Sequence, residues 1–209
     1  LPIATQVELG PAQVVPRGLH ALAVDVWARF QTREARVELE AAMLWAEIQQ
    51  ATLTPGVLFR DSLSSLQFGA ALETDFGEIY GDFSAGIDFG IASGDSAPGF
   101  GAFPQVGQAS PRPGDIDGPQ AAVPTDTTVD NFRFPPHYRI DRLLFRELIG
   151  TVTDAFSFRP HLRWRLLDFS GGSLTANLFA VASFAMEPSS TPGGDRPLGI
   201  EIDPGIVYQ

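Results

Sequence analysis

The chain contains neither cysteine nor lysine, and each absence narrows the possible structures and partners. Without cysteine it forms no disulfide and no thiolate metal site. Its 14 basic residues are all arginine, and 25 acidic residues give a net charge of −11. Because a nucleic-acid-binding domain needs a basic surface, this balance argues against nucleic acid as a partner.

The sequence also lacks the run of ~20 apolar residues that a membrane-spanning helix requires. Its best apolar stretch, ANLFAVASFAM at 176–186, is too short and contains Asn177 and Ser183. A helical membrane protein is therefore excluded. A membrane β-barrel stays open, because its strands need only ~9–11 residues and only every second one must be apolar.

Alternation of apolar and polar residues is what the sequence has in abundance. In FSFRPHLRWRL, residues 156–166, a file of Phe, Leu and Trp alternates with a file of Ser, Arg and His. The same period of two recurs in GEIYGDFSAGIDFGIAS, SSLQFGAALET, SLTANLFAVASFAM and PLGIEIDPGIVY. This period predicts β-strands. The run at 77–93 exceeds the ~5–6 residues of a usual soluble strand.

Turns and loops separate these predicted strands. ALAVDVWARF and ARVELEAAMLW are joined by the short polar turn QTREA, which predicts a hairpin. Residues 94–131 are rich in Pro, Gly, Ser and Asp and show no period. Such a long loop is unusual in a compact domain but is an ordinary extracellular loop on a membrane barrel.

Two stretches are harder to assign. In YRIDRLLFRELIG, residues 138–150, Ile140, Leu144 and Leu148 have helical spacing, so both a helix and a strand with charged ends stay open. Pro160 interrupts the otherwise regular alternation of 156–166. Because proline has no N–H to donate to a β-ladder, we expect a local irregularity there.

Two settings suit ribbons of this kind. In a soluble all-β binding module, such as a sandwich, the apolar files pack against each other and the polar files face water. In an outer-membrane barrel the apolar files face lipid and the charged files face an aqueous lumen. Trp27, Trp45, Trp164 and Tyr80 then fit interfacial girdles, whereas in a soluble sheet they are core aromatics.

Three stretches resemble a poorly characterised family of bacterial outer-membrane β-barrel proteins, similar to alginate-export and porin-like barrels. They are DVWARFQTREARVELEAAMLWAEI, FRFPPHYRIDRLLFRELIGTVTDAFSFRPHLRWRL and STPGGDRPLGIEID. The resemblance covers most of the chain outside 94–131 and implies the bacterial outer membrane as location and the lipid bilayer as partner. It also implies a strand at Tyr138–Ile149, a turn at Gly150–Asp154, and a chain that is a fragment of a longer protein.

The expected fold is an all-β, antiparallel, up-and-down transmembrane β-barrel of about eight strands, with 94–131 as its long loop. The expected function is a porin-like channel or exporter for small or anionic solutes. Arg159, Arg163 and Arg165 form a positive strip that attracts acidic solutes, or else they pair with carboxylates and hold the wall together. The expected pore-lining residues are Arg139, Arg159, His161, Arg163, Arg165, Glu38, Glu40, Asp82, Asp88 and Glu201.

Catalytic and metal-binding motifs are absent from the sequence. It contains no H-E-x-x-H, no G-x-S-x-G, no phosphate loop and no dinucleotide fingerprint. GDIDG at 114–118, with Asp126 and Asp130 nearby, lacks the Gly and Glu positions of a calcium loop and is predicted to be a solvated loop. The sequence therefore predicts no enzyme activity, no cofactor and no metal.

Overall fold

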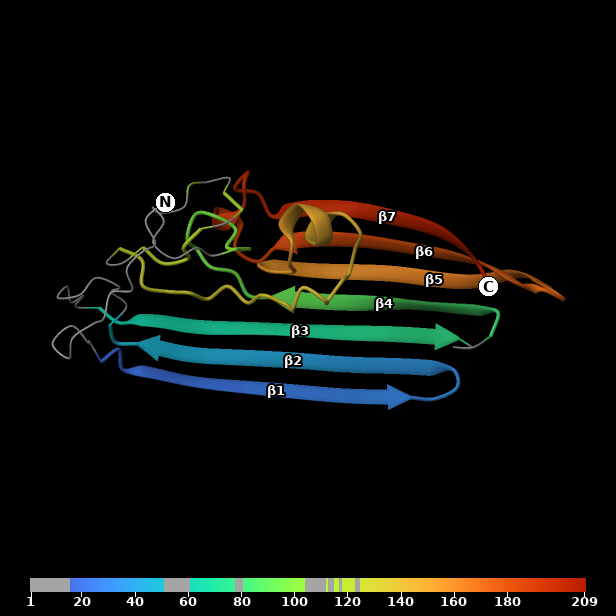
Figure 1. Ribbon diagram of the computed structural model, residues 1–209, viewed down its shortest axis with the longest axis horizontal. Helices are drawn as coiled ribbons and strands as arrows, with labels where there is room; N and C mark the ends of the chain where they lie inside the picture. Colours follow the sequence, from blue (N-terminus) through green and yellow to red (C-terminus); the bar gives the residue numbers. More distant parts are fainter. Residues whose placement is uncertain are drawn as a thin grey trace, which may run out of the picture.

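The structure is a computed structural model that describes residues 16–50, 61–77, 81–103, 112, 115–116, 118–122 and 125–209. These residues form one antiparallel sheet of seven strands, in which each strand pairs with the next along the chain (Figure 1). The strands are β1 Leu19–Gln31, β2 Ala35–Ile48, β3 Leu63–Gly77, β4 Phe83–Ala92, β5 Ala155–Phe169, β6 Gly172–Ala185 and β7 Pro197–Tyr208.

The prediction of an all-β, antiparallel, up-and-down fold is confirmed. The sheet has seven strands rather than about eight, and it is open between β1 and β7, so the described residues do not form a closed barrel. The strands are long, from 10 residues in β4 to 15 in β3 and β5. The predicted hairpin is β1–β2, in which Gln31 pairs with Arg36 across a short turn.

The alternating run at 77–93 is not the single strand that its period predicted. Gly77 ends β3, and β4 begins at Phe83. A Cβ atom at Gly77 would lie 2.6 Å from the carbonyl oxygen of Phe83, and its φ is +108°, so the chain turns sharply where only glycine fits. The alternation of the sequence continues across residues 78–82, which separate the two strands, so it gives no sign of the break.

The irregularity expected at Pro160 is confined to one side of β5. Pro160 pairs with Ile87 in β4 without a register change. On the β6 side, the ladder leaves out Arg159 and Pro160 but resumes in the same register at His161. The only register shift between β5 and β6 in the described residues lies between Arg165 and Leu167.

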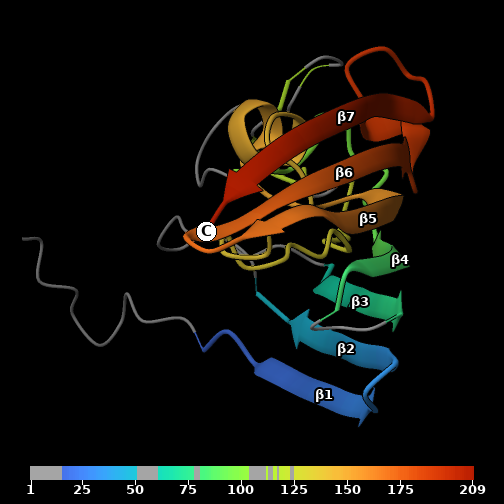
Figure 2. The ribbon, with the colours of Figure 1, turned by 90° about the vertical axis from the view of Figure 1, so that its right-hand side faces the viewer.

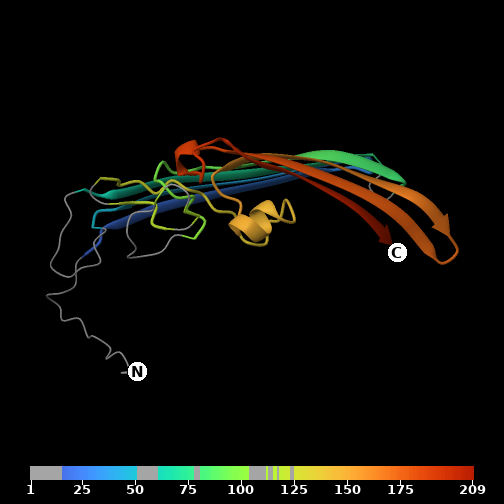
Figure 3. The ribbon, with the colours of Figure 1, turned by 90° about the horizontal axis from the view of Figure 1, so that it is seen from above.

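The sheet is curved, and the segment between β4 and β5 lies on its concave face (Figures 2 and 3). This segment is anchored to the strands by hydrogen bonds: Val129 N–H donates to the carbonyl of Ser64, and Arg159 Nη1 donates to the carbonyl of Ile140. A small core forms beneath it from Phe100, Ala102, Ile140, Phe145, Ile149, Val152, Ala155 and Val181.

The strand that the family resemblance implied at Tyr138–Ile149 is wrong, and the helical spacing was the better guide. Leu144–Ile149 is a π-helix, η2, which ends at Gly150 with φ +89°. Carboxylates stabilise its first turn. Asp141 accepts hydrogen bonds from the N–H groups of Phe145 and Arg146. Among the described residues no helix is long and apolar enough to cross a membrane.

Candidate functional site

The convex face of the sheet is apolar and uncovered. Because side chains alternate along each strand, one file of every strand points to this face. Its exposed members include Leu22, Val26, Phe30, Trp45, Phe68, Phe76, Phe83, Phe156, Trp164, Ile200, Ile202 and Ile206. Trp164 is 54% exposed and Ile200 is 77% exposed. The described residues form one sheet only, so the second layer that a sandwich needs is not among them.

The concave face carries the charges. Arg36 lies at the centre of a network that joins β2 to β3: its guanidinium is 2.7 Å from Glu38, 2.8 Å from Glu73 and 3.1 Å from Asp75. Glu38 also accepts hydrogen bonds from Arg29 and from the indole N–H of Trp27 on β1. Three neighbouring strands are thereby linked through one arginine and one glutamate.

A second network joins β3, β4 and β5. His161 Nε2 lies 3.0 Å from Asp75, and its Nδ1 lies 3.5 Å from Asp88. The longer contact does not meet hydrogen-bond geometry, so His161 Nδ1 has no hydrogen-bond partner among the described atoms. Arg159 makes an ion pair of 2.7 Å with Asp88, whose side chain is only 8% exposed.

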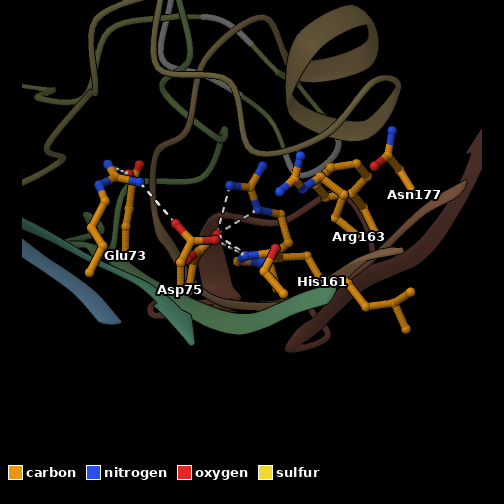
Figure 4. Close-up of a pocket in the computed structure, with 11 residues that line it drawn as sticks. Glu73, Asp75, His161, Arg163 and Asn177 are labelled. Atoms are coloured by element: carbon orange, nitrogen blue, oxygen red, sulfur yellow. Dashed lines mark hydrogen bonds and ion pairs between the residues drawn. The ribbon is translucent and has the colours of Figure 1, made fainter. Parts of the chain in front are cut away.

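These side chains line a pocket of about 290 Å³ (Figure 4). Glu73, Asp75 and His161 lie along one part of it, and Arg163 and Asn177 lie beside one another further along. The ring of Phe179 stacks on that of His161 at 6.0 Å between centroids. The pocket therefore combines guanidinium groups, carboxylates and an aromatic face, which suits a polar solute with more than one kind of group.

A smaller pocket of about 190 Å³ adjoins it and shares Arg159 and Phe179. It lies between β5–β7 and the segment before η2, from which Arg139 and Asp141 contribute. The carboxylate of Glu201 on β7 accepts hydrogen bonds from the N–H groups of residues 142, 143 and 144. Glu201 thus holds the start of η2 against the sheet.

The expected pore-lining residues fall into three groups. Most lie on the concave face of strands, namely Glu38, Glu40, Asp88, Arg159, His161, Arg163, Arg165 and Glu201. Arg139 lies outside the strands, in the segment that covers the sheet, and lines the smaller pocket. Asp82 lies in the turn before β4 with its side chain 77% exposed, 3.8 Å from Arg165.

Sequence reasoning missed four members of the networks: Arg29, Arg36, Glu73 and Asp75. Arg36 precedes the expected Glu38 by two positions, and Arg29 lies opposite Glu38 in the register of β1 and β2. Glu73 belongs to the alternating run SSLQFGAALET, and Asp75 lies two positions further on the same face. The alternation itself was thus the signal. The pairing predicted for the arginines is present at Arg159 with Asp88 and, more loosely, at Arg165 with Asp82 and Asp168.

Outside the strands, Asp154 is a buried carboxyl that forms no ion pair with an arginine or histidine of the described residues. It accepts hydrogen bonds from Glu187 N–H at 2.7 Å and from the hydroxyl of Ser190. Burial raises the pKa of Asp154 to about 6, although these hydrogen bonds act in the opposite direction. Its backbone has a φ of +43°. Through these hydrogen bonds, Asp154 links the connection between β6 and β7 to the residue that precedes β5.

The described residues were also searched for groups of side chains that could bind a metal ion. No group of three or more His, Asp or Glu able to hold a metal ion occurs in the described part of the chain. Of the expected solvated loop, Gly114 and Asp117 lie outside that part, as does Tyr80.

No protein-family model matches the chain, and no curated protein matches it. The resemblance to outer-membrane barrels therefore stays a prediction.

Proposed function

We propose that the sheet is part of the wall of a bacterial outer-membrane β-barrel, and that this barrel is a passive, porin-like channel or exporter for small or anionic solutes. The uncovered convex face carries the proposal. Soluble monomers rarely expose contiguous apolar patches larger than a few hundred Å². Here exposed Phe, Leu, Ile and Trp side chains run across all seven strands, and hydrocarbon is the surrounding that they suit.

The two ends of the sheet also support this proposal. At one end the connections are short, at 32–34, 78–82 and 170–171. At the other end they are long, at 49–62, 93–154 and 186–196. Outer-membrane barrels have this asymmetry, with short periplasmic turns and longer extracellular loops. The strand lengths of 10 to 15 residues also reach the ~9–11 that a tilted membrane strand needs.

A barrel requires more than this sheet. In an antiparallel meander of seven strands, β1 and β7 run in the same direction. They therefore cannot pair with each other in the antiparallel manner that closes bacterial barrels with an even strand number. The proposal requires at least one further strand between them.

The concave face supports the solute class that we propose. Arg159 is neutralised by Asp88, and Arg165 lies near two aspartates, so these two arginines mainly hold the wall together. Arg163 lines the larger pocket beside Asn177 and donates to the carbonyl of Gly81. In this proposal Arg163 contributes to the arginine strip because it lines the larger pocket, where positive charge lowers the barrier to entry of acidic solutes.

Extraction and conductance test the proposal in sequence. The protein is expected to partition with membranes, to need detergent for extraction, and to change gel mobility on boiling. A chain that stays in buffer as a monodisperse species would contradict the membrane assignment. Single-channel recording in planar bilayers then tests the pore, and a barrel that does not conduct would contradict transport.

Reversal potentials in a salt gradient test the arginine strip. We expect the wild-type channel to prefer chloride over potassium. Arg163→Gln is expected to shift the reversal potential towards the equilibrium potential of potassium. Arg33→Gln serves as the control, because Arg33 is exposed between β1 and β2 and lines neither of the two pockets. Cation preference in the wild-type channel would contradict the role of the strip while leaving the channel itself in place.

A further inference from the structure

A third pocket, of about 290 Å³, has chemistry opposite to that of the charged pocket. It lies between η2 and residues 191–198, which form the end of the β6–β7 connection and the start of β7. Its floor is the buried core: Phe100 is 3% exposed and Ile149 is 8% exposed. Leu144 and Leu198 pack against the same core and form its sides. Leu148, with 60% exposure, stands at the rim.

The rim opposite η2 is fixed by hydrogen bonds. The Thr191 hydroxyl donates to the carbonyl of Pro188 at 2.9 Å and can alternatively bond that of Asp195 at 3.0 Å. Gly194 N–H donates to the carbonyl of Thr191 at 3.1 Å. Ser190 is held by Asp154 from below. Because these polar groups are bonded to each other, the pocket is preformed and offers its occupant mostly carbon surface.

We infer that this apolar pocket, formed by η2 and residues 191–198, binds a small uncharged hydrocarbon-like molecule. Binding sites for small molecules are typically concave, mostly apolar and largely preformed. The pocket has roughly twice the volume of the ~150 Å³ cavity that holds one benzene molecule. An alkylbenzene or a molecule of naphthalene size therefore fits it.

Charge decides against an anionic occupant. Asp195 is the only ionisable side chain among the described lining residues, and no arginine or histidine is among them. A carboxylate ligand would meet the negative charge of Asp195 and lose its hydration without a cationic partner. The ligand class thus differs from that of the charged pocket, and the site does not depend on channel function.

Binding of 4-fluorotoluene tests the inference. The full chain is kept in detergent at a fixed concentration, and 19F NMR follows the probe against micelles without protein. We expect saturable binding at one site. The anionic counterpart 4-fluorobenzoate is expected to show no saturable binding.

Matched variants locate the site. Leu148→Gln places a polar group at the rim and is expected to weaken binding by roughly ten-fold. Leu143→Gln is the control, because Leu143 is 57% exposed beside the same helix but does not line the pocket. Gly193→Leu adds a bulky side chain at the opposite rim, where a Cβ has room with Asp195 at 3.4 Å, and is expected to narrow the entrance and weaken binding.

Three outcomes would overturn the inference. They are a probe signal explained by micelles alone, equal affinity in wild-type and Gly193→Leu protein, and saturable binding of 4-fluorobenzoate. None of these depends on conductance, so the site and the channel can fail separately.

Discussion

The convex and concave faces of the sheet are made by the same seven strands but have opposite chemistry. On the convex face, large apolar side chains stand uncovered from β1 to β7. On the concave face, arginines meet carboxylates at 2.7–3.1 Å across neighbouring strands. The difference teaches that charge is tolerated in this sheet where it is paired and faces other polar groups. On the convex face of the described strands the ionisable side chains are His20 and Glu47, which lie opposite each other at one end of β1 and β2.

Adjacent alanines in the middle of β2 give the sharpest test of this contrast, with the largest expected effect. Ala41 lies between Leu39 and Met43 on the convex face, and Ala42 lies opposite Asp25 on the concave face. Ala41→Arg is expected to lower the free energy of unfolding in lipid vesicles by roughly 2–4 kcal/mol, the cost of a lipid-facing arginine near mid-bilayer.

Ala42→Arg is the matched control. Its guanidinium can pair with Asp25, so the expected change is below about 1 kcal/mol. Urea titration of the protein in vesicles measures both variants. Equal losses would remove the distinction between the two faces.

Asp154 extends this comparison to a buried carboxyl, because it is held by hydrogen bonds and not by an ion pair with arginine. Burial raises its pKa from 3.8 to about 6, so the folded protein holds a proton that the unfolded chain has lost between these values. Stability contributed by the protonated form is therefore complete below pH 3.8 and falls as pH rises towards 6, by up to about 3 kcal/mol.

Asp154→Asn is expected to remove this component from the dependence of unfolding free energy on pH. Denaturant titrations from pH 3.5 to pH 7 in detergent provide the profile. Asp61→Asn, at an exposed position before β3, is the control and should retain the wild-type profile. A wild-type profile that persists in Asp154→Asn would assign the pH dependence to another group.

On the concave face, we expect the contribution of an ion pair to the free energy of unfolding to increase with its burial. Asp88 accepts hydrogen bonds from Arg159 at 2.7 Å and 3.0 Å and from Thr74 N–H at 3.1 Å. Asp88→Asn can still accept from Thr74 but leaves Arg159 without its counter-charge. We expect a loss of about 1–3 kcal/mol in unfolding free energy.

The exposed pair gives the smallest effect. Asp82 lies 3.8 Å from Arg165 with most of its side chain in solvent. Asp82→Asn should change the unfolding free energy by less than about 1 kcal/mol. A loss as large as that of Asp88→Asn would show that burial does not govern these pairs.

The strands and the sidedness of their residues could be predicted from the sequence, because a period of two assigns every residue of a strand to a face. Arg159, His161 and Arg163 were placed on one face in this way, and they lie together on the concave side. What alternation could not show is where a strand stops. The pattern continues across residues 78–82, and the close approach of Gly77 to Phe83 reveals the break.

The helix η2 and the ion-pair partners depend on contacts that are distant in sequence. Glu201, on the last strand, accepts hydrogen bonds from the N–H groups that begin η2, so the local leucine spacing could not decide between helix and strand. Likewise, Arg36 meets Asp75 because of the register between β2 and β3. A long connection joins these two strands, and its sequence does not fix that register.

The three tryptophans allow the central claim, that the convex face contacts hydrocarbon, to be tested most directly. Trp45 and Trp164 lie on the convex face, whereas Trp27 lies on the concave face with its indole N–H bonded to Glu38. In variants that retain one tryptophan each, reconstituted in vesicles of brominated lipid, bromine should quench Trp45 and Trp164 strongly and Trp27 weakly. Strong quenching of Trp27 with little of the other two, or no difference among the three, would contradict the account.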